Sequence, residues 1–170
     1  IRKHIEWARG SGVDGFIASW WGRGDLTDQA TRALVGIAEK EKFQVSAYLE
    51  DAKDERQLSD DIAFLAREYG SSPAWLKVDG RPVIFVYVRV AMKFPPASFA
   101  KARGNAVLVM DSFDLSMGRA GGAMHTYNPV FDDPERLRRS YEALRVASSV
   151  HGLVFAATVT PGFDNSYVDP

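Results

Sequence analysis

The sequence predicts an α/β fold, namely a (β/α)8 TIM barrel in which this chain supplies about six of the eight strands. Strand-like and helix-like segments alternate along the chain, which is typical of parallel βαβ units. A complete barrel needs about 250 residues, or roughly 30 for each βα unit. Because the chain has 170 residues, we expect one incomplete barrel domain over residues 1–170, without the first and last strands.

Six segments have the β-branched, aromatic or continuously apolar content of strands. They are Val13–Trp21, Phe43–Leu49, Pro82–Val88, Ala106–Met110, Ala123–Tyr127 and Leu153–Val159. The third and fourth segments are almost entirely apolar, as expected for strands that are covered on both faces. We therefore place these two in the middle of the sheet.

The segments between the strands have the apolar spacing of amphipathic helices. Ile1–Arg9 precedes the first strand and Thr27–Lys42 follows it. The next helix has apolar residues at i, i+4, i+7, i+8 and i+11 from Leu58, and Gly70 is placed to end it. Asp133-Pro134-Glu135 supplies an N-cap, a first-turn proline and an acidic residue for the helix before the last strand.

Composition excludes several classes of function. With 21 basic and 22 acidic residues, the net charge of −1 gives no broad attraction to nucleic acid or to an anionic membrane. The chain has no cysteine, which excludes thiol catalysis, cysteine-ligated metals and disulfides. No apolar run approaches the ~18 residues of a membrane span. A small or neutral ligand fits this composition better.

The alternative fold is a complete six-stranded doubly wound sheet, which usually carries a glycine-rich phosphate loop between a strand and a helix. Residues 21–25 contain only two glycines, and the glycine-rich residues 118–122 precede a strand where a phosphate loop should precede a helix. The sequence therefore favours the barrel and predicts no nucleotide cofactor.

Aromatic and acidic residues gather where the predicted strands end. The candidate site residues are Trp20, Trp21, Glu50, Tyr87, His125, Tyr127 and Asp164. Ligands of parallel α/β folds bind at the carboxyl ends of the strands. Flat rings cover the C–H faces of a sugar, and carboxylates bind its hydroxyls. The three histidines lack metal-binding spacing, so we expect a sugar site without a metal.

Structural roles compete with several of these assignments. Trp20 and Trp21 are adjacent and must point to opposite faces of a strand, so at least one of them should lie in the core. Glu50 could form an ion pair with Arg89 instead of contacting a ligand. Asp111 follows a strand and could equally cap a turn.

Five segments resemble glycoside hydrolase family 99, the endo-α-mannosidases and endo-α-mannanases, and the family-99-like proteins. The similar segments are 12–22 (GVDGFIASWWG), 48–50 (YLE), 69–87 (YGSSPAWLKVDGRPVIFVY), 123–127 (AMHTY) and 159–164 (VTPGFD). They follow the family's order and spacing. The chain differs at residues 88–90, where Val-Arg-Val replaces a usual Asp-Ser-Tyr, and at His125, which replaces a tyrosine.

The resemblance implies a (β/α)8 barrel that cleaves α-mannosidic bonds internally, with retention of configuration and without a metal or other cofactor. The family's two catalytic glutamates lie in a motif at the eighth strand, and this chain contains no Glu-x-x-Glu pair, so no residue is assigned a catalytic role. The resemblance implies an oligosaccharide or polysaccharide substrate and a secreted, periplasmic or cell-surface location.

Two other functions remain open at this level. One is a glycosyltransferase-like relative that acts in polysaccharide biosynthesis, and the other is a non-catalytic glycan-binding remnant. An incomplete barrel would also leave two strand edges unpaired, which favours self-association through those edges.

Overall fold

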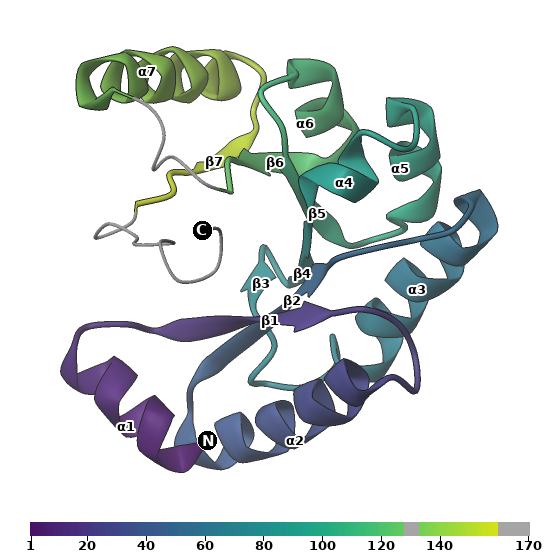
Figure 1. Cartoon of the computed structure of the whole chain (residues 1–170), viewed down its shortest axis with the longest axis vertical. Helices are drawn as coiled ribbons and strands as arrows, with labels where there is room; N and C mark the ends of the chain where they lie inside the picture. Colours follow the sequence, from purple (N-terminus) through teal and green to yellow (C-terminus); the bar gives the residue numbers. More distant parts are fainter. Residues whose placement is uncertain (128–132, 160–170) are drawn as a thin grey trace, which may run out of the picture.

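The computed structural model describes residues 1–127 and 133–159 of the chain. A sheet of parallel strands runs through them in the order β1-β2-β4-β5-β6-β7. The bounds are β1 Gly15–Trp20, β2 Gln44–Leu49, β4 Arg81–Val86, β5 Val107–Asp111, β6 Gly122–His125 and β7 Val154–Ala156. All six predicted strands are confirmed, with bounds that differ from the predicted ones by at most three residues. The sheet curves from β1 to β7 with helices on its outer side (Figure 1).

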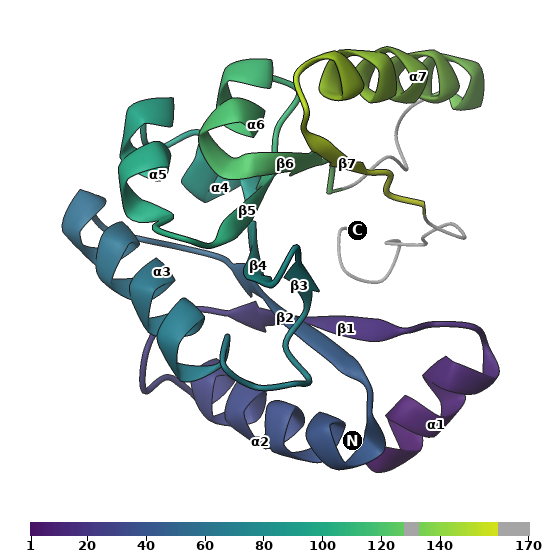
Figure 2. The same ribbon diagram turned by 180° about the vertical axis from the view of Figure 1, so that it is seen from behind.

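The order of the strands distinguishes the two folds that the sequence allowed. A doubly wound sheet reverses direction at a switch point and so carries helices on both faces. Here each parallel strand pairs with the next parallel strand of the chain, without reversal. Because βαβ crossovers are right-handed, a constant direction puts the crossover helices on one face. The arrangement is therefore that of a barrel wall, and Figure 2 shows the same helical layer from behind.

The helices are α1 Arg2–Gly10, α2 Leu26–Glu41, α3 Glu55–Glu68, α4 Val88–Ala91, α5 Pro96–Ala102, α6 Leu115–Gly121 and α7 Pro134–Val150. Asp133 caps α7 as predicted, accepting hydrogen bonds from the N–H groups of residues 135 and 136. The short helices α4, α5 and α6 were not predicted individually. Because α4 begins at Val88, β4 ends at Val86, before the predicted Val88.

A seventh strand, β3 Lys77–Val78, pairs antiparallel with β4 and was also not predicted. Asp79 and Gly80 join the two strands and both have positive φ, of 50° and 74°. Positive φ at both central residues is the requirement of a type I′ hairpin turn, for which Asp-Gly is a favoured pair. The sequence therefore contained the signal for this hairpin.

Helix α3 ends just before Gly70, as predicted, but glycine is required there for a different reason. Helix α3 ends at Glu68, but Gly70 is not in the left-handed conformation. A Cβ at this position would lie 2.2 Å from the backbone oxygen of Ala66 and 2.9 Å from the Cβ of Pro82. Glycine is required here because the backbone passes close to its neighbours.

The buried residues form two clusters on opposite faces of the sheet. The larger cluster faces the helices and includes Trp20, Leu49 and Ile62. The smaller cluster lies on the inner face and contains Tyr48, Val83, Phe85, Val107, Val109 and Ala123. Alternation along each strand separates the two sets.

Asp28, on α2, is hydrogen-bonded to β1, to the loop after β1 and to the residue that follows α3. Its buried carboxylate accepts hydrogen bonds from Trp20 Nε1 at 3.0 Å, the Tyr69 hydroxyl at 2.6 Å and the Gly24 N–H at 2.9 Å. Burial acts to raise the pKa of Asp28, but these hydrogen bonds outweigh it and hold the pKa below the ordinary value of 3.8.

We predict that Asp28→Asn lowers the free energy of unfolding by about 1–3 kcal/mol, because the asparagine NH2 would face one of the three donors. The pKa of Asp28 is lower in the folded state than in the unfolded state. Its contribution to the free energy of unfolding is therefore fully present above the unfolded-state pKa of about 3.9 and is lost as the pH falls through the folded-state pKa. Urea unfolding at pH 7 and pH 3 measures both effects. A variant as stable as the wild type at pH 7 would contradict the prediction.

In the described residues, β1 and β7 each pair with one neighbour only. Ile17 on β1 is 49% exposed and lines an apolar hollow of about 430 Å³ with residues of α1 and α2. An unpaired apolar edge is a template for strand pairing with another chain.

We predict that the 170-residue chain self-associates and that Ile17→Lys reduces the association, because lysine on an edge strand opposes pairing. Sedimentation velocity measures the effect. Leu26→Lys is the matched control, since Leu26 is exposed on α2 and not on the edge strand. A monodisperse wild-type monomer would contradict the prediction.

Candidate functional site

Aromatic and ionisable side chains meet on the inner face of the sheet, at the carboxyl ends of the strands. Tyr48 lies at the centre of this group. Its ring centroid is 5.5 Å from that of His125 and 5.7 Å from those of Tyr87 and Tyr127. Tyr87 and Tyr127 also contact each other edge to face at 5.3 Å. Rings from β2, from the end of β4 and from the end of β6 therefore form one aromatic surface.

The hydroxyl of Tyr48 lies between two ionisable groups, 3.2 Å from Asp111 Oδ2 and 3.1 Å from His125 Nε2. All three side chains are buried. Burial, with the Asp111 charge, raises the pKa of Tyr48, so the hydroxyl keeps its proton. Because the carboxylate only accepts, the Tyr48 hydroxyl donates to Asp111, and the tautomer of His125 sets the direction of its contact with the Tyr48 oxygen.

Asp111 also binds the backbone that follows two neighbouring strands. Its Oδ2 accepts the Val88 N–H at 3.1 Å, and its Oδ1 accepts the Tyr127 N–H at 3.0 Å. Burial raises the pKa of Asp111 and lowers that of His125, while the two groups partly offset each other's shift. Asp111 therefore fixes the segments that carry Tyr87 and Tyr127.

Glu50 and Trp21 extend the site toward β1. Glu50 accepts a hydrogen bond of 2.5 Å from the Ser19 hydroxyl. Trp21 is 45% exposed. Arg89 lies across the end of β2, with its guanidinium 5.6 Å from the Trp21 ring centroid and 5.7 Å from that of Tyr87. The sequence allowed an ion pair between Glu50 and Arg89. The ion pairs of the described residues do not include it.

Five of the seven candidate residues lie in this group: Trp21, Glu50, Tyr87, His125 and Tyr127. Trp20 does not, because it is 0% exposed in the helix-facing core and hydrogen-bonded to Asp28. One tryptophan of the pair is in the core, as alternation predicted. Asp164 lies outside the described residues.

Three residues of the site were not among the candidates: Tyr48, Asp111 and Arg89. Residue alternation could have identified the first, since Tyr48 is two positions before Glu50 on the same face. Asp111 does not cap a turn, whereas Asp114 caps α6. No sequence pattern predicted the contact of Arg89 with Trp21, because it joins the segments that follow β4 and β1.

Two further features bear on ligand class. Among the residues that the structure describes, no group of three or more His, Cys, Asp or Glu side chains could hold a metal ion. In the same residues, no helix is long and apolar enough to cross a membrane.

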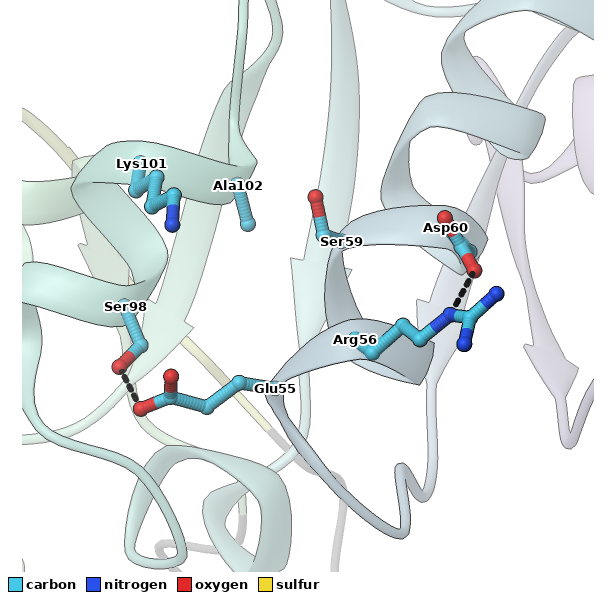
Figure 3. Close-up of a pocket in the computed structure, with 7 residues that line it drawn as sticks. All are labelled: Glu55, Arg56, Ser59, Asp60, Ser98, Lys101 and Ala102. Carbon is cyan, nitrogen blue, oxygen red and sulfur yellow. Dashed lines mark hydrogen bonds and ion pairs between the residues drawn. The ribbon is translucent and has the colours of Figure 1, made fainter.

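A separate polar hollow of about 360 Å³ lies in the helical layer between α3 and α5 (Figure 3). Ser98 donates to Glu55 at 2.6 Å, and Arg56 lies 3.9 Å from Asp60. The first contact joins α5 to α3 and the second runs along α3, so the three charged groups just named already have a partner in the protein.

A family model described as glycosyl hydrolase family 99 matches residues 1–114. The chain belongs to this family. The match covers β1 to β5 and the segments that carry Trp21, Glu50, Arg89 and Asp111. The resemblance inferred from the sequence is confirmed.

Solved structures of family 99 have the same fold. The endo-α-mannosidase from Bacteroides thetaiotaomicron in complex with BIS-TRIS-propane aligns with a TM-score of 0.84 at 20% identity, over 99% of this chain and 58% of that one. A second structure of that endo-α-mannosidase aligns with a TM-score of 0.80 at 21% identity, over 97% and 54%. No curated protein sequence matches the chain.

This chain therefore spans somewhat more than half the length of those family-99 structures. The fold class predicted from the sequence, an incomplete TIM barrel, is confirmed by the strand order and by these alignments.

We predict that Asp111→Asn lowers the free energy of unfolding by about 1–3 kcal/mol, since its NH2 would face the Val88 or Tyr127 N–H and leave one buried donor unsatisfied. Urea unfolding measures the change. Asp114→Asn is the control, because asparagine caps a helix as well as aspartate does. Equal stability of the two variants would overturn the role given to Asp111.

Proposed function

We propose that this chain supplies the sugar-binding rim of a glycoside hydrolase that acts on α-linked, mannose-containing glycans, as a retaining endo-α-mannosidase does. The observation that carries the proposal is the group of exposed rings and one accessible carboxylate at the strand ends of a family-99 barrel wall. We also propose that residues 1–170 belong to one barrel domain.

The rings supply contacts that fit a sugar. Trp21 and Tyr127 are 45% and 56% exposed, so their faces are available to the C–H faces of a pyranose. Tyr127 is held by its backbone hydrogen bond to Asp111 and by its ring contacts with Tyr48 and Tyr87. A surface that is rigid before binding loses little conformational entropy when the ligand arrives.

Glu50 supplies the polar contact. Ser19 orients the carboxylate by donating to Oε1, and Oε2 has no hydrogen bond or ion pair within the described residues. A carboxylate oxygen in this position accepts hydrogen bonds from sugar hydroxyls, which are stronger than those between neutral groups.

We predict that Trp21→Ala weakens binding of an α-mannooligosaccharide about tenfold or more, because truncation of an aromatic hot spot costs about 2 kcal/mol or more and about 1.4 kcal/mol is tenfold. Isothermal titration calorimetry with the full protein chain measures the affinity. Trp7→Ala is the matched control, since Trp7 is exposed on α1, outside the strand-end group. Equal affinity of the Trp21 variant and the wild type would contradict the assignment.

Hydrolysis is tested separately. We expect the full protein chain to release internal fragments from α-mannan with retention of anomeric configuration, detected by chromatography and by NMR of the first product formed. Failure on a broad panel of α-linked glycans would argue against the hydrolase.

A second candidate is glycan binding without hydrolysis. It is favoured by one observation: of the strand-end carboxylates in the described residues, Asp111 is fully used by protein donors and Asp51 is paired with Lys93 at 3.4 Å. Glycosidases need two acting carboxyl groups. Saturable binding of a mannoside by the full chain, with no turnover, would select this candidate.

A further inference from the structure

Arg89 presents a cation at the strand ends that has no acidic partner among the described residues. Its guanidinium contacts Trp21 and Tyr87, at distances within the roughly 6 Å over which a cation is attracted to a ring face. The two rings follow β1 and β4, and β2 lies between these strands in the sheet. The side chain therefore crosses the region where Glu50 follows β2.

The neighbouring acids already have donors of their own. Glu50 accepts from Ser19, Asp51 pairs with Lys93, and Asp111 accepts from Tyr48 and two backbone N–H groups. Several exposed basic residues elsewhere do form ion pairs, such as Arg32 with Glu68 at 2.7 Å. At the strand ends, the charge of Arg89 is left available for a ligand.

We propose that Arg89 makes the site selective for glycans that carry an anionic group, either the carboxylate of a uronic acid or a sulfate or phosphate ester. This inference rests on the proposed function, because it specifies the class of glycan bound at the same site. It concerns the charge of the ligand and not the position of the cleaved bond.

The chemistry of the guanidinium suits this ligand. Its planar fork donates two parallel hydrogen bonds to a carboxylate or to an ester oxyanion, which a lysine ammonium cannot do. The two rings restrict where the fork can lie, while the side chain stays exposed to a ligand. The same rings remain available to the sugar that bears the anionic group.

Glu50 complements this arrangement. Its carboxylate accepts neutral hydroxyls and repels an anion, whereas Arg89 attracts the anion. An acidic sugar can therefore bind in one orientation, with hydroxyls toward Glu50 and the anionic group toward Arg89. A neutral sugar uses Glu50 and the rings only.

The test compares the binding of three matched trisaccharides to the full protein chain. The first is a neutral α-linked mannotriose, the second contains one glucuronic acid residue, and the third carries one sulfate ester. Calorimetry at pH 7 is run on the wild type, Arg89→Gln and Arg89→Lys. Arg9→Gln is the matched control, because Arg9 is also exposed and lies over a ring, that of Phe43, but on α1, which precedes the amino end of β1. Thermal unfolding verifies that each variant is folded.

We expect at least one anionic probe to bind the wild type tenfold or more tightly than the neutral probe, and this preference to weaken as salt rises. Arg89→Gln should weaken binding of the anionic probes at least tenfold more than binding of the neutral probe, and so abolish the preference. Arg89→Lys should retain part of it, and Arg9→Gln all of it. Comparing the two anionic probes identifies the preferred group.

Two results would overturn the inference, and they differ in what else they overturn. If the neutral probe binds as tightly as both anionic probes, or if Arg89→Gln keeps the preference, the anionic specificity is wrong while the sugar-binding rim stands. If none of the three probes binds the wild type, the proposed function fails as well.

Discussion

Alternation of side chains along parallel strands is the constraint on which both the core and the site depend. Consecutive residues of a strand point to opposite faces. Trp20 therefore enters the helix-facing core, while Trp21 reaches the inner rim. The same parity puts Tyr48 and Glu50 on the inner face of β2, with Leu49 on the other. Because the strands follow one another without reversal, their inward residues converge at one end of the wall.

The inner face of the sheet buries a carboxylate, a phenol and an imidazole together. Buried polar groups are costly unless their hydrogen bonds are made. Asp111 resolves this by accepting from Tyr48 and from the backbone of Val88 and Tyr127. The same bonds connect the ends of β4, β5 and β6. A network that satisfies its own polar groups thus also holds the exposed rings in position.

The periodic features of the fold were predictable from the sequence, because each depends on local spacing. The six parallel strands and the amphipathic helices follow from runs of apolar residues, and the absence of a phosphate loop favoured the barrel. The short helices α4 to α6 are too brief to show a period. Long-range contacts accompany them, such as the hydrogen bond from the N–H of Val88, the first residue of α4, to Asp111.

The site was predictable only in part, for the same reason. That Trp21, Glu50, Tyr87, His125 and Tyr127 lie at strand ends follows from the strand assignments. The partners of these residues do not, because each contact joins segments that are far apart in sequence. Tyr48 and Asp111 are separated by 63 positions, and Tyr48 and His125 by 77. Only the register of the sheet, with Asp111 opposite His125, brings them together.

The contacts of the strand-end charges indicate what each can do for a ligand. Both carboxylate oxygens of Asp111 accept hydrogen bonds from backbone N–H groups, and Asp51 is paired with Lys93. Glu50 keeps one carboxylate oxygen and Arg89 its guanidinium without a polar partner in the described part of the chain. A ligand at the strand ends would thus meet the free carboxylate oxygen of Glu50 and the guanidinium of Arg89. The rings of Trp21, Tyr87 and Tyr127 lie beside them. Such a combination suits the binding of a polyhydroxylated molecule, as the proposed function requires, whereas acid–base cleavage of a glycosidic bond needs two carboxyl groups. Under the proposed function, this part of the barrel would therefore hold the glycan, since its described strand ends leave one carboxylate open to a ligand.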